Sequence, residues 1–335
     1  MAALNTTMRS GLVHAVSQGG SAIISALLIV AIVSVIAAGM VTRQGVLIRT
    51  LEAEQFRSQN SAVLSGGLEV SRMLLWDSRR KNRTTRLDQA WAQPIGPAVN
   101  EALSQSGGDF QGLLEDQQGK FNLRNLLLNR QLDIGQLRSF ERLCQFISIT
   151  DALCQRISQR VFASYLRFPS SATEAGRSSF ESGREKSLVE GKTPTPASLP
   201  VLRSLDDLQG LPGLSDQMLE RLKRYVCILP EKTWVNSNTA SAEVLAAVVP
   251  GLSLPSAQIL VAERDRGQWF SYRSEITARM RLSPQGAEEL EVGIGSEWFL
   301  LQGQARRDGR LLSMEALLYR RDYKVPQVIW SRIGL

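Results

Sequence analysis

The side chains on which most acid–base and nucleophilic catalysis depends are scarce in this sequence. The chain of 335 residues contains a single histidine, His14, which precedes a long apolar segment. Serine and cysteine hydrolases need an imidazole base, and catalytic zinc sites are commonly built on histidine. If the part of the chain before the apolar segment is removed, no histidine is left, and these classes of enzyme are excluded.

The three cysteines do not have metal-site spacing. Cys144, Cys154 and Cys227 form no C-x-x-C pair, so we expect neither a zinc ribbon nor a thioredoxin-like site. If this part of the chain lies outside the cytoplasm, Cys144 and Cys154 are predicted to form a disulfide between two consecutive helices. Closing a loop of about ten residues is worth about 3 kcal/mol. The alternative is three buried free thiols.

The acidic residues also have structural explanations. Asp206 and Asp207 open a predicted helix, where carboxylates complement the helix dipole. Glu263, Arg264 and Asp265 are typical of a charged helix face. Since no nucleophile has a base nearby, we predict that the protein is not an enzyme and has no catalytic residue, metal or cofactor.

The net charge of +7 is spread along most of the chain. The densest basic run is residues 79–83, which read RRKNR, followed by Arg86. This run lies just past the predicted end of a long helix, where cations complement the dipole. A surface for an anionic partner is the alternative.

An uncharged segment at residues 21–42 follows a glycine pair and dominates the N-terminal part. Its 22 residues span roughly 33 Å as a helix, enough to cross a bilayer core of about 30 Å. The segment is longer than the apolar region of a secretory signal peptide, which has about 7–15 residues. Two interpretations of the segment remain. It is either a plain signal anchor or the helix that follows a prepilin-type leader cut between Gly20 and Ser21. The polar residues before the segment, followed by glycine, fit the prepilin-type leader.

The apolar pattern continues beyond the span as a stripe on a solvated helix, so we predict one helix over residues 21–76. The residues expected in the membrane or filament are Ile23, Ile24, Ala26, Leu27, Leu28, Val30, Ala31 and Val33. Those expected to pack against neighbouring helices outside the membrane are Leu47, Leu51, Phe56, Leu64 and Leu68.

The rest of the chain reads as a mixture of strands and helices. Alternating residues predict a strand over 110–116, and helical spacing runs from 133 to 167. Residues 169–200 are predicted to be a long mobile loop. Strands are expected at 298–305, 311–319 and 325–332, with Asp308 and Gly309 as a hairpin turn. We therefore predict an α+β fold, in which early and late strands share one antiparallel sheet and the helices are inserted between them.

Several local patterns together resemble the minor pseudopilin K family (GspK) of bacterial type II secretion systems. They are the leader before Ser21 and residues 91–94 (WAQP), 116–123 (DQQGKFNL), 235–241 (VNSNTAS) and 330–332 (WSR). Most pseudopilins carry a glutamate five residues into the mature chain. Cleavage after Gly20 places Ser25 there, and the K family characteristically lacks this glutamate, which suits a subunit at the filament tip.

The resemblance implies a long N-terminal transmembrane and amphipathic helix packed on a pilin-like antiparallel sheet, with a large inserted α-helical domain. It implies a tip complex with the I and J minor pseudopilins, contact with other pseudopilins, and cleavage and N-terminal methylation by prepilin peptidase. The protein is expected to cross the bacterial inner membrane once, with its globular part in the periplasm. The implied division is a leader at 1–20, the helix at 21–76, the first part of the pilin-like domain at 77–132, the insert at 133–290 and the last strands at 291–335.

One stretch of the sequence differs from the pattern of the family. Relatives often bind calcium in the insert, but residues 164–192 mix Glu with Arg and Lys, so calcium binding is expected to be weak or absent.

The sequence LPGLS at 211–215 is repeated in similar form as VPGLS at 249–253. These turns resemble helix-hairpin-helix modules, and the alternative function is therefore a DNA-binding protein of a DNA-uptake pseudopilus; the leading hypothesis has no nucleic-acid partner.

Overall fold

The computed structural model describes residues 19–96, 109–128, 131–165, 196–280, 290–307, 310–321 and 324–334. The chain divides into two compact units, Met1–Gln59 and Asn60–Leu335. The leader up to residue 18, most of the predicted 169–200 loop, and the turn at Asp308 and Gly309 lie outside the described residues.

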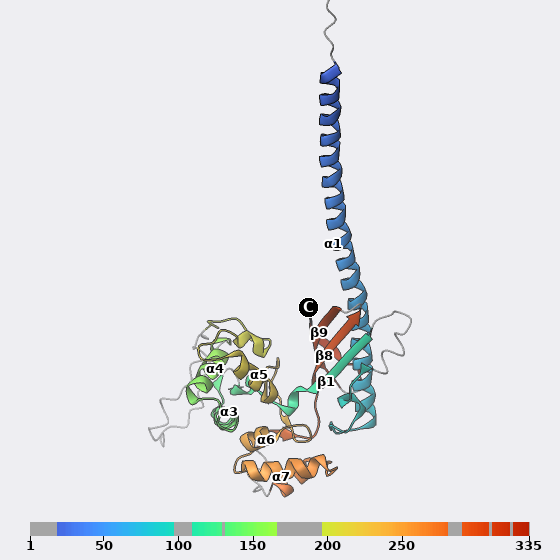
Figure 1. Ribbon diagram of the computed structural model, residues 1–335. Coiled ribbons are helices and arrows are strands. Elements are labelled where there is room, and N and C mark those ends of the chain that lie inside the picture. Colours follow the sequence, from blue (N-terminus) through green and yellow to red (C-terminus); the bar gives the residue numbers. More distant parts are fainter. Residues whose placement is uncertain are drawn as a thin grey trace, which may run out of the picture. The chain divides into compact units, whose positions relative to one another are not determined.

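Helix α1 runs over Gly19–Lys81 and supplies the whole described part of the first unit (Figure 1). The predicted end at residue 76 was five residues too early, because Arg79, Arg80 and Lys81 form the last turn and do not lie beyond it. Cations in a last turn interact favourably with the negative end of the helix dipole, and neither glycine nor proline interrupts the sequence there.

The second unit contains a four-stranded antiparallel sheet in the order β1-β8-β9-β10 (Figure 1). Its strands are β1 (Asp109–Asp116), β8 (Trp298–Arg307), β9 (Arg310–Tyr319) and β10 (Gln327–Gly334). The prediction that early and late strands share one sheet is therefore confirmed. The part of α1 in this unit covers the sheet, and Val63, Leu64 and Leu75 join one core with Phe110 and Phe299.

Phe110 occupies a place that three glycines leave open. A Cβ atom at Gly67 of α1 would lie 2.2 Å from Cε2 of the Phe110 ring, and one at Gly112 of β1 would lie 2.7 Å from its Cε1. Gly303 of β8 would place a Cβ 3.0 Å from Cε2. Glycine thus allows helix and sheet to close on one fully buried aromatic ring.

The helical module between the strands has a core of its own. Its helices are α3 (Ile134–Phe146), α4 (Asp151–Ala163), α5 (Asp216–Tyr225), α6 (Ala242–Val248), α7 (Leu254–Asp265) and α8 (Arg273–Arg279). The helical spacing predicted over 133–167 is divided into α3 and α4 by a turn in which Ser148 has φ of 58°.

Short strands and 3₁₀ turns lie between the longer elements. The strands are β2 (Phe121–Asn122), β3 (Leu127–Leu128), β4 (Gln131–Leu132), β5 (Val226–Cys227), β6 (Val235–Asn236) and β7 (Val292–Gly293). The 3₁₀ turns are η1 (Ala90–Ala92), η3 (Gln117–Gly119), η4 (Leu123–Leu126) and η5 (Leu205–Leu208). Parallel pairing of β2 with β5 and of β6 with β7 joins distant parts of the sequence.

The module begins earlier than residue 133. Phe121, Leu123 and Leu126 are buried in its core, where the ring of Phe121 stacks on that of Phe140 at 5.6 Å. At the other end, Leu290 and Val292 belong to the same core. The structural insert therefore extends beyond 133–290 on both sides, because short strands that look like parts of the sheet pair inside the module instead.

Candidate functional site

The part of α1 in the first unit presents an uncovered apolar surface. The residues predicted for the membrane or filament, Ile23, Ile24, Ala26, Leu27, Leu28, Val30, Ala31 and Val33, are all exposed. Among the described residues, α1 is the one helix long and apolar enough to cross a membrane, and none of its most apolar stretch is buried by the chain itself. Such a surface is stable in lipid or against other apolar helices. The predicted cleavage site, Gly20 and Ser21, lies in the first turn of α1.

The apolar stripe beyond the span serves two purposes. Leu47 and Leu51 are exposed, and Phe56 is half-buried. Leu64, however, is 0% exposed, and Leu68 packs beside it against the sheet. The prediction that all five residues contact neighbouring helices was therefore wrong for Leu64 and Leu68, because the protein's own sheet covers that part of the stripe.

Two of the patterns noted in the sequence meet at one buried carboxylate. Asp116, at the end of β1, accepts hydrogen bonds through Oδ2 from Nδ2 of Asn236 (3.0 Å), the hydroxyl of Thr239 (2.6 Å) and the hydroxyl of Ser296 (2.5 Å). Its Oδ1 accepts from the backbone N–H of Gln118 at 2.8 Å and so begins the η3 turn. We call Asp116, Asn236, Thr239 and Ser296 the junction, because they tie the sheet to the helical module.

Burial dominates the electrostatics of the junction. It raises the pKa of Asp116 above the ordinary value of an aspartate, although the hydrogen bonds from Ser296, Thr239, Asn236 and Gln118 act in the opposite direction. A carboxyl group this enclosed costs free energy when it ionises, so its hydrogen-bond donors decide whether the fold tolerates it. These interactions indicate a structural role for the Asp116 carboxyl group, which connects the sheet to the helical module.

A buried arginine extends the junction toward the end of α1. Arg320, just after β9, donates to the hydroxyl of Thr85 and to the carbonyl of Ser296, both at 2.7 Å. Its guanidinium also lies 4.6 Å from the centre of the Phe299 ring. Sequence reasoning missed Arg320, Thr85 and Ser296, since isolated polar residues carry no local pattern. Trp91, within the WAQP pattern, is buried and packs edge-on against Phe299 at 5.1 Å.

Asp206 and Arg264, which both lie in acidic stretches of the sequence, make structural contacts. Asp206 pairs with Nζ of Lys223 at 2.8 Å and also with Arg332 of β10. Partial burial opposes the shift, but these two cations hold the pKa of Asp206 below its usual value. Arg264, expected on a charged helix face, is only 3% exposed and donates to the carbonyl of Ala240 at 2.6 Å. That expectation was wrong, because Arg264 donates to backbone carbonyls of the VNSNTAS segment itself.

The repeated Pro-Gly turns pack inside the module. Gly213 and Gly251 have φ of 86° and 79°, and Ser215 and Ser253 cap α5 and α7. Val249 is fully buried, and the apolar residues of both turns contact the module core. No observation on these turns favours DNA binding.

Cys144 and Cys154 form a disulfide between α3 and α4, with their Cα atoms 6.3 Å apart. Cys227 is a buried free thiol, and burial raises its pKa.

Within the described residues, no group of three or more His, Cys, Asp or Glu side chains is placed to hold a metal ion. Most of the stretch considered for calcium lies outside the described residues.

We expect Cys154→Ser to lower the free energy of unfolding of the second unit by about 3 kcal/mol, since the unfolded chain loses its closed loop. Urea unfolding of the wild type and of Cys227→Ser should shift on addition of dithiothreitol, and that of Cys154→Ser should not. A wild type indifferent to the reductant would contradict the prediction.

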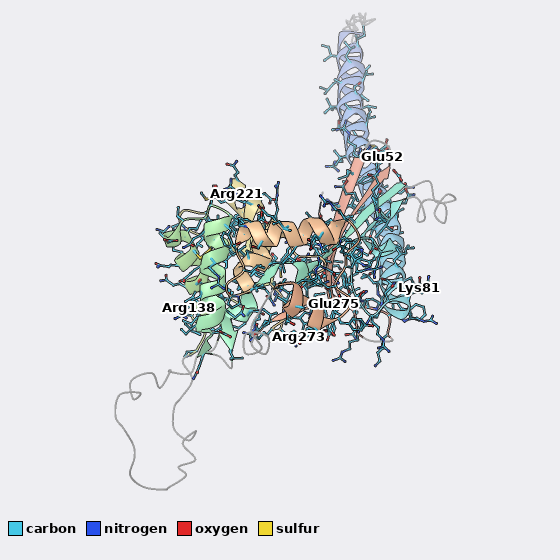
Figure 2. All side chains as sticks on the ribbon, turned by 90° about the horizontal axis from the view of Figure 1, so that it is seen from below. Glu52, Lys81, Arg138, Arg221, Arg273 and Glu275 are labelled. Atoms are coloured by element: carbon cyan, nitrogen blue, oxygen red, sulfur yellow. A yellow bond between two sulfur atoms is a disulfide. The ribbon has the colours of Figure 1, made fainter. Side chains whose placement is uncertain are left out.

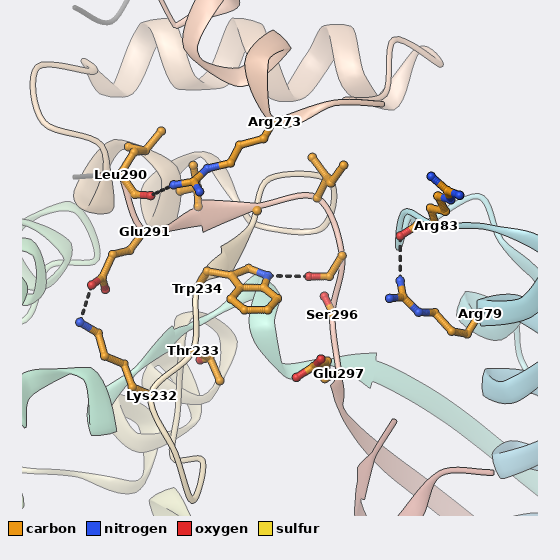
Figure 3. A pocket seen from close by; sticks show the side chains of 14 residues that line it. Arg79, Arg83, Lys232, Thr233, Trp234, Arg273, Leu290, Glu291, Ser296 and Glu297 are labelled. Carbon is orange, nitrogen blue, oxygen red and sulfur yellow. Dashed lines mark hydrogen bonds and ion pairs between the residues drawn. The ribbon is translucent and has the colours of Figure 1, made fainter. Parts of the chain in front are cut away.

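One open groove lies beside the junction (Figure 3). It has a volume of about 890 Å³ and lies between the end of α1, the segment before β6, the start of α8 and the 290–297 segment. Trp234 lies within it, and its indole Nε1 donates to the carbonyl of Gly295 at 2.8 Å. We call it the Trp234 groove. Its charged residues are Arg79, Arg83, Lys232, Arg273, Glu291 and Glu297.

Comparisons with known proteins place these features in a family. The family models described as "Type II secretion system (T2SS), protein K" match residues 119–231 and 235–295, together more than half of the chain. Type II secretion system protein K of Pseudomonas aeruginosa is 28% identical over 293 residues, which cover 84% of this chain and 83% of that protein. The chain belongs to the type II secretion protein K family. It is thus a minor pseudopilin of type II secretion.

Other relatives agree with this membership. Protein K of Pectobacterium carotovorum subsp. carotovorum is 24% identical over 334 residues, covering 95% of this chain and 97% of that protein. GspK in the crystal structure of the GspK-GspI-GspJ complex from enterotoxigenic Escherichia coli shares the fold, with a TM-score of 0.62 and 17% identity over 85% of this chain and 99% of that one. As a pseudopilin with one apolar N-terminal helix, this protein K family member is a membrane-anchored protein.

Proposed function

We propose that this protein K family member is the tip subunit of a type II secretion pseudopilus, and that it starts assembly together with the I and J minor pseudopilins for protein secretion across the outer membrane. The solved relative with the same fold was crystallised in a GspK-GspI-GspJ complex. The observation that carries the proposal is the apolar surface of α1, which the chain leaves wholly uncovered over its most apolar stretch. Such a surface needs other helices once the subunit leaves the lipid.

The identity of residue 25 supports a tip position. If the chain is cut after Gly20, Ser25 takes the place at which most pseudopilins carry a glutamate. In the shared model of assembly that glutamate pairs with the N-terminal amine of a neighbouring subunit. A subunit that lacks it supports others below and need not dock onto one above.

The role we propose is not enzymatic. The polar groups that the structure brings together are engaged in structural contacts: Asp116 holds the junction, Asp206 pairs with Lys223 and Arg332, and Arg264 binds carbonyl groups. We propose that the globular part lies in the periplasm, beyond the inner membrane. The disulfide between Cys144 and Cys154 supports an oxidising compartment.

Processing by prepilin peptidase provides the direct test of the leader. We expect the protein isolated from membranes that contain the peptidase to begin with a methylated Ser21, and the protein from cells lacking it to keep residues 1–20. Gly20→Asp should block the change by placing a charged side chain at the cleaved bond, whereas Gly19→Ala should not. Amino-terminal sequencing that finds the same start in both strains would reduce the protein to a simple signal-anchored one.

We also propose that the protein needs no metal, and that calcium binds weakly or not at all. Calcium takes six to eight oxygen ligands, and the mixed charges of residues 164–192 supply few carboxylates without a neighbouring cation. Calorimetric titration of the calcium-free protein should therefore show no micromolar binding. A saturable micromolar isotherm would overturn this expectation.

A further inference from the structure

The Trp234 groove has the form of a binding site. Side chains from four separate segments meet there: Arg79 from the end of α1, Arg83 just after it, Trp234 before β6, and Arg273 from the start of α8 (Figure 3). A hollow of about 890 Å³ lies within the size range of ligand sites, about 300–1,000 Å³. It belongs entirely to the second unit.

Two arginine side chains of the groove are available to an anion. Among the residues that the structure describes, no carboxylate pairs with Arg83 or Arg273. The Arg273 guanidinium donates to the carbonyl of Leu290 at 2.6 Å. This hydrogen bond fixes the position of the guanidinium, but a neutral carbonyl does not neutralise its charge. Lys232, by contrast, already pairs with Glu291 and Asp133. Arginine in such a position binds carboxylates through two parallel hydrogen bonds.

Trp234 is held in place before any ligand arrives. Its indole N–H is bound by Gly295, and its ring lies against Gly293, where a Cβ atom would be 2.5 Å from Cδ1. The side chain is nevertheless 43% exposed. A large aromatic side chain that is both ordered and accessible is typical of the residues that dominate protein interfaces, since little entropy is lost when it is covered.

We propose that the Trp234 groove binds an extended acidic peptide segment of a protein partner. Carboxylates of the segment pair with Arg83 and Arg273, and an apolar or aromatic side chain between them lies on Trp234. The groove also contains Glu291 and Glu297. These carboxylates repel the continuous phosphates of a nucleic acid but leave room for a peptide whose charges are spaced apart. The site goes beyond the proposed tip function and does not depend on it.

The test uses the full-length protein in detergent micelles and a short fluorescein-labelled peptide in which glutamate and tyrosine alternate. Fluorescence anisotropy should show saturable binding that weakens in high salt. A matched peptide with glutamine in place of glutamate should bind at least about tenfold more weakly. A fluorescein-labelled single-stranded oligothymidylate of similar length serves as the nucleic-acid probe and should bind more weakly than the acidic peptide.

Charge reversal locates the site. Arg83→Glu combined with Arg273→Glu should weaken binding of the acidic peptide by at least about tenfold. Arg138→Glu makes the same kind of change on α3, away from Arg273 in Figure 2, and should leave binding within about twofold. Trp234→Ala should weaken binding with the second unit still folded by circular dichroism, and Trp234→Phe should restore most of it.

Three results would overturn the proposal. The first is that the acidic peptide does not bind the wild type. The second is that it binds the wild type and the double arginine variant equally well. The third is that the oligothymidylate binds the wild type more tightly than the acidic peptide does, and that the double arginine variant abolishes this binding. The last result would identify the groove as a nucleic-acid site.

Discussion

Asp116→Ala is expected to destabilise the second unit by roughly 3–5 kcal/mol and to loosen the helical module from the sheet. The substitution removes the acceptor of the Ser296 hydroxyl and of the Gln118 N–H, and the nearest acceptor of the Thr239 hydroxyl. Each buried donor left without a partner costs about 1–3 kcal/mol, whereas Nδ2 of Asn236 keeps Thr85 and Ser296 as acceptors. Urea unfolding of the full-length protein in micelles, followed by tryptophan fluorescence, measures the loss. Asp88→Ala is the control, because Asp88 is exposed and only pairs with Arg86, which makes it worth at most about 1 kcal/mol.

The same carboxyl group predicts a pH dependence. Its pKa in the folded protein is raised above the value of 3.8 that describes an ordinary aspartate. The folded state therefore binds the proton more tightly than the unfolded state, and this contribution to stability is lost as pH rises through the raised pKa. The unfolding free energy of the wild type should thus increase relative to that of Asp116→Asn as pH falls through the raised pKa toward 3.8. A difference that does not change with pH would contradict the raised pKa.

The second large effect is expected at Gly67. Gly67→Val places side-chain atoms where the Phe110 ring lies, because even a Cβ atom at residue 67 would be 2.2 Å from Cε2 of that ring. Phe110 is fully buried, and Gly112 and Gly303 also approach its ring closely, which restricts the movement that could relieve the clash. We expect a loss of about 3 kcal/mol or more in unfolding free energy, at the upper end for overpacked cores.

A double-mutant cycle separates this clash from a general effect on α1. Phe110→Ala opens a cavity and should itself cost about 3–5 kcal/mol, but adding Gly67→Ala to that variant should be neutral or stabilising. Gly45→Ala is the matched control, since nothing lies within 4 Å of a Cβ atom at that position. It should be neutral or stabilising in urea unfolding. If Gly67→Ala were equally harmless in the wild type, the close approach of helix and sheet would be refuted.

Much of the fold could be predicted because its signals are local. An uncharged run of membrane-spanning length, alternating residues in β1, and serine caps before α5 and α7 each depend on nearby residues alone. The end of α1 and the start of the module were less accurate. Basic residues are as compatible with a last helical turn as with the loop after it, and Phe121 and Leu123 carry no sign of which core they enter.

The junction could be predicted only in part. The segments around Asp116 and Asn236 were recognisable as patterns, but their meeting depends on pairing between residues 120 positions apart. Arg264 is flanked by acidic residues and therefore had the appearance of a surface residue, whereas tertiary contacts bury it. The sequence around Gly67 carries no sign of the residue that it meets, and only the position of the Phe110 ring explains why a glycine is needed there.

We propose that the uncovered α1 surface joins this protein K family member to the I and J minor pseudopilins at the tip of a pseudopilus. The most direct measurement is native mass spectrometry of the complex extracted from membranes in which all three proteins and the prepilin peptidase are produced together. We predict an assembly with one copy of each protein, which Leu47→Glu combined with Leu51→Glu weakens. A processed protein that is recovered alone, with I and J assembled in its absence, would contradict this proposed role of α1.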